Sequence, residues 1–161
     1  MTDVTYSEAA MSDLHALAAM RIRMIEEEHP LPDGQKRLIS ENTKQFLFDE
    51  ISKDTAVVWT AVFSEQLIGM GTVNFFSLPP NDWCLNGKTA YIGNLYVLPE
   101  FRRKGIASEL LSRLNEEAKK RECQRILLHT TEAGRPLYEK FGFEASPSAM
   151  ALYPFGIKPE S

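Results

Sequence analysis

The chain has little of the chemistry that metal centres and disulfide scaffolds require. It contains only two cysteines among 161 residues, Cys84 and Cys123, and no Cys-x-x-Cys pair or Cys/His spacing typical of zinc sites. Disulfides are rare in reducing compartments. We therefore expect free thiols, no bound metal and a cytoplasmic protein.

Long apolar runs and surplus positive charge are also missing. No run approaches the roughly 20 apolar residues of a membrane-spanning helix, and the N-terminus lacks the cationic and apolar regions of a signal peptide. The formal net charge is −4, whereas nonspecific binding of nucleic acid requires an excess of cations. We expect no membrane and no nucleic acid as partner, and the acidic balance favours a cationic small molecule.

Hydrophobic periodicity predicts one domain over residues 1–161 with mixed strands and helices. Strands are expected at 3–9, 55–63, 67–76, 89–97, 125–131 and 149–155, and helices at 11–28, 36–53, 105–122 and 134–143. The early strands are expected to be antiparallel. Strand 89–97, helix 105–122 and strand 125–131 form a crossover, which makes those two strands parallel.

The stretch NLYVLPEFRRKGIASELL, residues 94–111, combines a strand, a cationic turn and a helix. A helix N-terminus leaves backbone N–H groups unpaired and carries partial positive charge, which suits a phosphate. Gly105 permits positive φ and close approach of a ligand, and Arg102, Arg103 and Lys104 add charge. The alternative is a solvated loop with an ordinary turn glycine, and the residues alone give both interpretations equal weight.

A family resemblance favours the phosphate site. Val97, Pro99, Arg102, Gly105 and Ala107 match the pattern Val-x-Pro-x-x-Arg/Gln-x-x-Gly-x-Gly/Ala. The stretch thereby resembles motif A of the GNAT family of N-acetyltransferases, and PLYEKFGFE, residues 136–144, resembles motif B. The resemblance is sharp over residues 89–144, whereas the first 60 residues match only in outline.

The resemblance implies an α/β fold and a donor substrate. The implied fold has a mixed, mostly antiparallel sheet of six to seven strands with helices on both faces, and parallel strands that splay apart around the motif A helix. The implied co-substrate is acetyl-coenzyme A. Its expected contacts are the amides of Arg103, Lys104, Gly105, Ile106 and Ala107 with Ser108 at the pyrophosphate, the charge of Arg102, the backbone of Leu95, Tyr96 and Val97 along the pantetheine arm, and Thr131, where relatives often carry asparagine.

The implied reaction is direct attack of a primary amine of a small molecule or peptide on the thioester. Tyr138 stands where the family keeps its general acid, whereas Asn94 replaces a carboxylate that often serves as base. The remaining candidates for the base are Glu26, Glu27, Glu28, His29, His129 and a water chain. We assign Glu26, Asn94 and His129 to the acceptor side, with aromatic residues between 75 and 91 as further candidates for its pocket.

Two other functions compete with acetyl transfer. Asn94 in place of a carboxylate also suits a non-catalytic acyl-coenzyme A-binding regulatory module on the same fold. A kinase or other phosphate-binding protein is disfavoured, because both common nucleotide-binding glycine motifs and a magnesium-ligand cluster are missing. Family members often dimerise, so a homodimer is one possibility, and the sequence leaves the oligomeric state open. The amine and the acyl length stay open.

Overall fold

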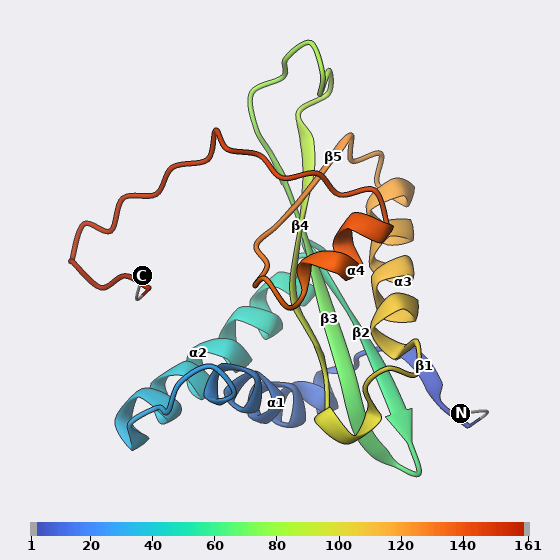
Figure 1. Cartoon of the computed structure of the whole chain (residues 1–161), viewed down its shortest axis with the longest axis vertical. Helices are drawn as coiled ribbons and strands as arrows, with labels where there is room; N and C mark the ends of the chain where they lie inside the picture. Colours follow the sequence, from blue (N-terminus) through green and yellow to red (C-terminus); the bar gives the residue numbers. More distant parts are fainter. Residues whose placement is uncertain (1–2, 160–161) are drawn as a thin grey trace. The chain divides into compact units, whose positions relative to one another are not determined.

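The structure is a computed structural model, and it describes residues 3–159. The chain forms two compact units, a larger one that ends at His129 and a smaller one that begins at Thr130 (Figure 1). Within the described residues, none of the helices has both the length and the apolar character needed to cross a membrane.

The larger unit is built on one five-stranded sheet. Its strands are β1 (Thr5–Glu8), β2 (Ala56–Phe63), β3 (Gln66–Ser77), β4 (Lys88–Val97) and β5 (Arg125–Leu128), in that spatial order. The first four are antiparallel neighbours, and β4 and β5 are parallel. The mixed sheet and the late crossover are therefore confirmed. The expected six to seven strands are wrong for residues 3–159, which contain five.

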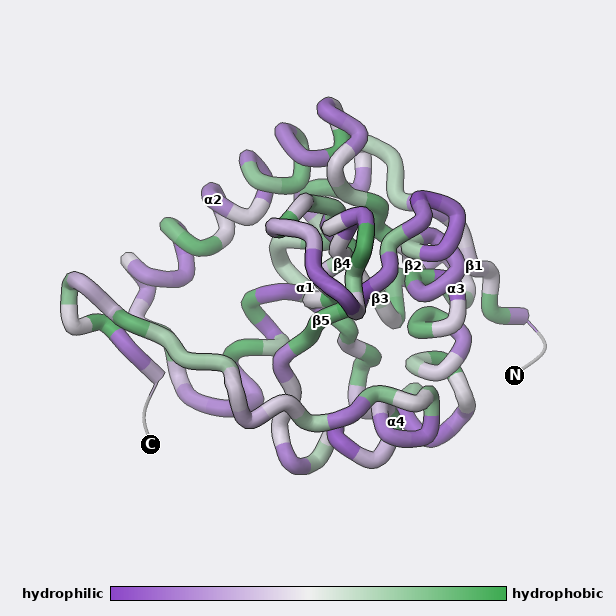
Figure 2. Tube along the Cα trace, turned by 90° about the horizontal axis from the view of Figure 1, so that it is seen from above, coloured by the Kyte–Doolittle hydropathy of each residue, from purple (hydrophilic) through white to green (hydrophobic). Residues whose placement is uncertain are grey.

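Helices cover both faces of this sheet. The 3-10 helix η1 (Met11–Asp13), α1 (Leu14–Glu26) and α2 (Asp33–Ser52) precede β2, and η2 (Pro99–Phe101) and α3 (Ile106–Lys120) follow β4. Figure 2 shows α3 on one side of the strands and the pair α1–α2 on the other. The expected arrangement of helices on both faces is thus confirmed.

The helix α3 packs a buried apolar face against the sheet. Its apolar residues recur at helical spacing, and Ile106, Leu110, Leu114 and Ala118 are all buried. Gly71 of β3 lets the helix approach the sheet closely, because a Cβ there would lie 2.7 Å from Cδ1 of Leu114. The chain between β4 and α3 is therefore attached to a helix whose position is set by core packing.

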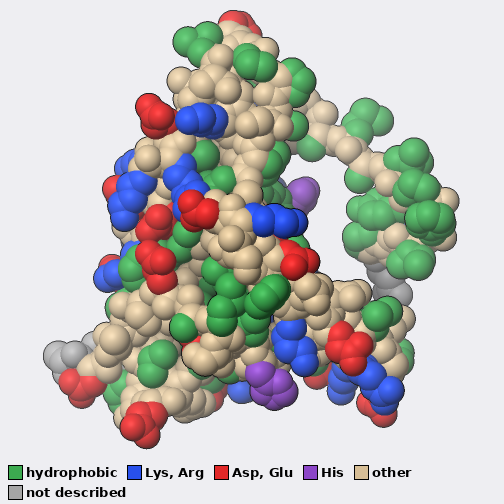
Figure 3. Space-filling view, turned by 180° about the vertical axis from the view of Figure 1, so that it is seen from behind, with side chains coloured by type: hydrophobic (Ala, Val, Ile, Leu, Met, Phe, Trp, Pro, Cys, Tyr) green, Lys and Arg blue, Asp and Glu red, His purple; other side chains and the backbone are tan. Residues whose placement is uncertain are grey.

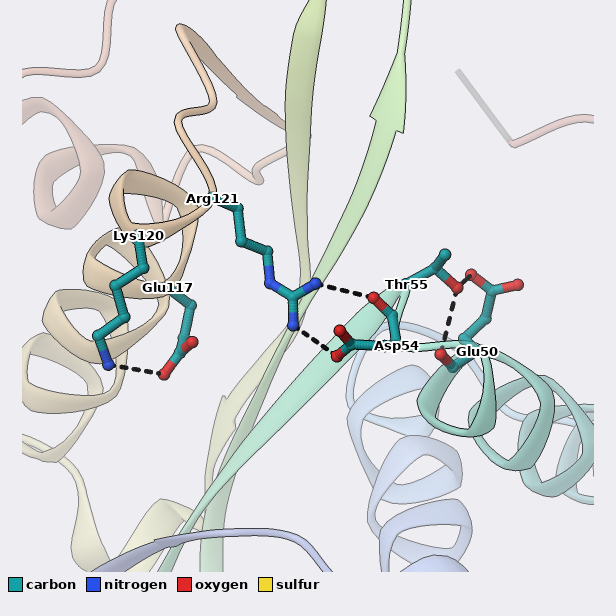
Figure 4. Close-up of polar contacts among 6 residues, drawn as sticks. All are labelled: Glu50, Asp54, Thr55, Glu117, Lys120 and Arg121. Atoms are coloured by element: carbon teal, nitrogen blue, oxygen red, sulfur yellow. Dashed lines mark hydrogen bonds and ion pairs between the residues drawn. The ribbon is translucent and has the colours of Figure 1, made fainter.

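Polar contacts join the far end of α3 to the turn between α2 and β2 (Figure 4). Arg121, which follows α3, donates from Nη1 to the carbonyl oxygen of Asp54 at 2.8 Å and from Nη2 to Oδ1 of Asp54 at 2.6 Å. In the same turn, Thr55 Oγ1 donates to Glu50 Oε2 at 2.7 Å. The contacts of Arg121 thus connect the residue after α3 to the turn that leads into β2.

The smaller unit contains α4 (Arg135–Lys140) and an extended C-terminal segment. The expected strand at 149–155 is wrong, because the described part of this segment contains no strand. Pro147 and Pro154 lack backbone N–H groups, and an isolated strand has no ladder partner. Its apolar side chains are exposed, including Met150, Leu152, Phe155 and Ile157 (Figure 3).

Candidate functional site

The strand β4 changes its character at a β-bulge around Asn94. Its register with β3 pairs Thr72 with Gly93 and Met70 with Tyr96, so that Gly71 faces two residues of β4. Asn94 has φ of 54°, in the left-handed region that asparagine tolerates better than most residues. Asn94, which stands where many relatives carry a carboxylate, is therefore also suited to the backbone conformation at this position.

Beyond the bulge, β4 has a strand partner on one side only. The parallel pairing with β5 ends where Ile92 faces Leu128, whereas β3 continues to pair with β4 as far as Val97. Among residues 3–159, no strand lies against the other edge of residues 93–97. The family resemblance implies that the two strands splay apart in this region, and an extended ligand can hydrogen-bond to the open edge.

The turn before α3 presents a row of backbone amides. Arg103 has φ of 60° and Gly105 has φ of 81°, and Gly105 is the N-cap of α3. A Cβ on Gly105 would meet nothing within 4 Å, so the backbone conformation rather than space favours glycine here. Within residues 3–159, the N–H groups of residues 103–108 make no hydrogen bond. The turn can therefore donate several hydrogen bonds to an anion.

The side chains of the turn fall into two groups. Arg103 and Lys104 are exposed, and Lys104 Nζ lies 5.7 Å from the ring centroid of Phe101. Arg102 is exposed as well, but it donates from Nε to the carbonyl oxygen of Val97 at 2.9 Å and from Nη2 to both carboxylate oxygens of Glu27 at 2.8 and 2.7 Å. The three cations of the sequence motif therefore have different surroundings.

Glu27 is further bound by Tyr96, whose phenol donates to Glu27 Oε1 at 2.5 Å. Burial, together with this hydrogen bond, raises the pKa of Tyr96 to about 12. Burial alone would raise the pKa of Glu27, but the hydrogen bonds from Arg102 and Tyr96 outweigh it and lower that pKa. Glu27 is thus a poor proton acceptor, and Tyr96 keeps its proton near neutral pH.

The other acidic candidates lie at the same end of α1. Glu26 forms an ion pair with Lys36 of α2, with 2.7 Å between Oε1 and Nζ. Glu28 and His29 are exposed in the turn that follows α1, and their backbone N–H groups both donate to the carbonyl oxygen of Ile25. The glutamate run is therefore a helix end in which two of the three carboxylates are already paired.

His129 and Tyr91 form a second polar cluster, at the end where β4 and β5 still pair. The Tyr91 phenol and His129 Nδ1 share a hydrogen bond of 2.8 Å. Burial raises the pKa of Tyr91, and the positive charge of Arg21 on α1 opposes that shift. The sequence reasoning missed Arg21. The signal that could have found it is its spacing of four residues from Leu17, which places it on the same side of α1 as that buried leucine.

In the smaller unit, Tyr138 lies on α4 and Thr131 in the turn before it. The half-buried Tyr138 ring packs edge-on against Phe143 with 5.8 Å between centroids. Thr131 Oγ1 accepts a hydrogen bond of 3.2 Å from the backbone N–H of Gly134. Pro136 sits in the first turn of α4, where its missing N–H costs no helical hydrogen bond.

Comparison with known proteins agrees with this arrangement. The model of the Acetyltransferase (GNAT) family matches residues 18–143, which is most of the chain. The chain belongs to the GNAT acetyltransferase family. The matched segment includes the β4 bulge, the turn before α3 and α4.

Three relatives of this GNAT protein show the range of similarity. A solved structure of a predicted acetyltransferase with acetyl-CoA, from Clostridium acetobutylicum, is 30% identical with a TM-score of 0.87 and covers 94% of this chain and 97% of its own. Glucosamine 6-phosphate N-acetyltransferase of Trypanosoma brucei brucei is 32% identical over 60% of this chain and 67% of its own. The uncharacterized N-acetyltransferase YjgM of Escherichia coli is 25% identical over 83% of this chain and 78% of its own.

The bulge yields a prediction about Asn94. Asn94→Gly and Asn94→Asp should unfold at nearly the same urea concentration as the wild type, because both residues tolerate positive φ. Asn94→Val should lose about 1–2 kcal/mol of unfolding free energy, because a β-branched residue is strained in the left-handed region. Equal stability of the valine and glycine variants would show that the bulge does not constrain this position.

Proposed function

We propose that this GNAT protein is a single-domain enzyme that transfers an acetyl group from acetyl-CoA to a primary amine of a small molecule or peptide. The observation that carries the proposal is the row of unpaired amides at residues 103–108, next to the open edge of β4. An anionic diphosphate and an extended arm are the two parts of coenzyme A that such a surface suits. The Clostridium relative was crystallised with acetyl-CoA, which supports the same donor.

The donor contacts follow from this surface. The amides of residues 103–107 bind the pyrophosphate, with Ser108 beside them, and the exposed side chains of Arg103 and Lys104 add attraction. The pantetheine arm forms backbone hydrogen bonds with Leu95, Tyr96 and Val97, as an added strand would. Thr131 is proposed as a further contact to the arm.

The reaction is a direct displacement at the thioester carbonyl. The amine nitrogen attacks the carbonyl carbon, and the tetrahedral oxyanion accepts a hydrogen bond from the amide of Val97 or a neighbour. The carbon–sulfur bond then breaks, and Tyr138 protonates the departing thiolate while the nitrogen loses its proton. Transfer from a phenol of pKa about 10 to a thiolate of pKa about 8.5 is unfavourable by about 2 kcal/mol, so hydrogen bonding by Tyr138 is as important as proton transfer.

The proton of the amine needs a different acceptor from Glu27. That carboxylate is bound by Arg102 and Tyr96, and its pKa is lowered. His129 is the candidate that we retain, because an imidazole nitrogen can act as a general base and the Nδ1 of His129 lies 2.8 Å from the Tyr91 phenol. The same displacement can proceed if a water molecule passes the amine proton to this pair, or if the amine binds in its neutral form.

The proposal is tested by thiol release from acetyl-CoA with a panel of amines. The panel should contain glucosamine 6-phosphate, as suggested by the trypanosomal relative, a polyamine, a lysine-containing peptide and a peptide with a free N-terminus. We expect release that depends on at least one amine and is abolished in Gly105→Val, because valine is strained at φ of 81°. Binding of acetyl-CoA without release would favour the regulatory module, and absence of binding would refute both.

The turn yields a prediction about the donor site. Arg103→Glu should raise the KM for acetyl-CoA roughly tenfold and change that for the amine little, because it replaces an exposed attraction of about 1 kcal/mol by a repulsion. Lys53→Glu, a charge-matched change at the exposed end of α2, should leave both constants unchanged. An equal rise of both constants in Arg103→Glu would contradict the assignment of the turn.

The general acid yields another prediction. Tyr138→Phe should lower kcat by at least tenfold with little change in the KM for acetyl-CoA, because it removes a group that acts on the leaving thiolate. Tyr153→Phe removes a phenol from the C-terminal segment and serves as the control. An unchanged kcat in Tyr138→Phe would eliminate Tyr138 as the acid.

A further inference from the structure

Arg102 has a different set of partners from the two cations that follow it. Its Nε and Nη2 donate to the Val97 carbonyl and to both oxygens of Glu27, and its guanidinium carbon lies 5.4 Å from the Tyr96 ring centroid. Of its hydrogen-bonding nitrogens, only Nη1 has no partner within residues 3–159. Most of the hydrogen-bond donors of the Arg102 side chain are therefore engaged within the protein.

The contacts of Arg102 join three separate segments. Glu27 directly follows the last residue of α1, Tyr96 and Val97 end β4, and Arg102 itself follows η2. Tyr96 belongs to the same buried cluster as Leu17 and Met20 of α1. We call Glu27 and Arg102, with Tyr96 as their shared neighbour, the Glu27–Arg102 clamp. It ties the helix on one face of the sheet to the turn that leads to α3 on the other.

The clamp acts on a turn that has few other constraints. Arg103 and Gly105 both have positive φ, and the amides of residues 103–108 have no partner among residues 3–159 to hold them. The segment is fixed before the turn by the bond from the Leu98 N–H to the Ile68 carbonyl oxygen at 2.9 Å, and after it by the buried residue Ile106. Between those two points, Phe101 packs against Phe63, and the charge-assisted hydrogen bonds of Arg102 join the segment to Glu27 at the end of α1.

We propose that Glu27 and Arg102 are positioning residues that hold this turn with its amides aligned for the diphosphate of the donor, an inference that rests on the proposed function. Arg102 thus acts on the donor through the backbone, whereas Arg103 and Lys104 act by direct attraction. The same contacts link the end of α1, next to the acceptor-side candidates, to the donor site.

A double-mutant cycle separates this role from direct contact between Arg102 and phosphate. Glu27→Gln and Arg102→Gln should each raise the KM for acetyl-CoA about fivefold. The KM of the double variant should not exceed the higher of the two single-variant values, because either change alone already breaks the clamp. Glu27→Gln combined with Arg103→Gln should instead give the product of the two single effects, because Arg103 does not belong to the clamp. The kcat of each variant is measured alongside its KM for acetyl-CoA, and kcat should change less than twofold.

Two kinetic outcomes would overturn the proposal. If Arg102 binds phosphate directly, Arg102→Gln raises the KM for acetyl-CoA while Glu27→Gln leaves it unchanged or lowers it, because the arginine is released. If the two residues act independently, the effects of Glu27→Gln and Arg102→Gln multiply in the double variant.

Hydrogen exchange in the ligand-free protein tests the clamp without any enzymatic activity. The N–H groups of Leu98, Phe101 and Arg102 are hydrogen-bonded, so their exchange reports opening of the segment before the turn. Their exchange should be at least about threefold faster in Glu27→Gln and in Arg102→Gln, and unchanged in Arg103→Gln. Unchanged exchange in all variants would refute the clamp even if the enzyme acetylates amines, whereas faster exchange in a protein without turnover would refute only the acetyl transfer.

Discussion

The site depends on one backbone constraint, which is that β4 has two neighbours for its first half and one for its second. Up to Ile92 the strand lies between β3 and β5, and from Gly93 to Val97 only β3 remains. Buried backbone groups need hydrogen-bond partners, so an edge that is left open inside a sheet is available to a ligand. The turn with unpaired amides lies directly after this edge, and the two features together form one continuous surface of backbone donors and acceptors.

Charge is distributed around this surface in a way that the total does not reveal. The protein carries a formal net charge of −4, yet Arg103 and Lys104 are exposed at the turn. Two of the three carboxylates at the end of α1 are engaged elsewhere, because Glu26 pairs with Lys36 and Glu27 with Arg102. Pairing within the protein thus leaves the two cations closest to the amides available, which is what an anionic donor requires.

Much of the fold was predicted from periodicity and turn residues. The helix expected at 105–122, the parallel crossover and the antiparallel early strands are all present, because each depends on local spacing of apolar residues. The strand expected at 149–155 was wrong because that prediction also relied on local spacing. Alternating apolar residues form a strand only where a neighbouring strand accepts its hydrogen bonds. Local pattern predicts the tendency of a segment, and pairing is a tertiary property.

By itself, the sequence determined the GNAT motif, the glycine at the start of α3 and the order of elements around it, because these depend on residues that are close together in the chain. Only the tertiary structure decided how the charged residues are used. Glu27 and Arg102 are 75 positions apart, and their ion pair distinguishes one arginine of the motif from the next. The bulge at Asn94 likewise depends on the register with β3, which no local pattern specifies. Side-chain roles of this kind follow from contacts between distant segments, and folding alone brings those segments together.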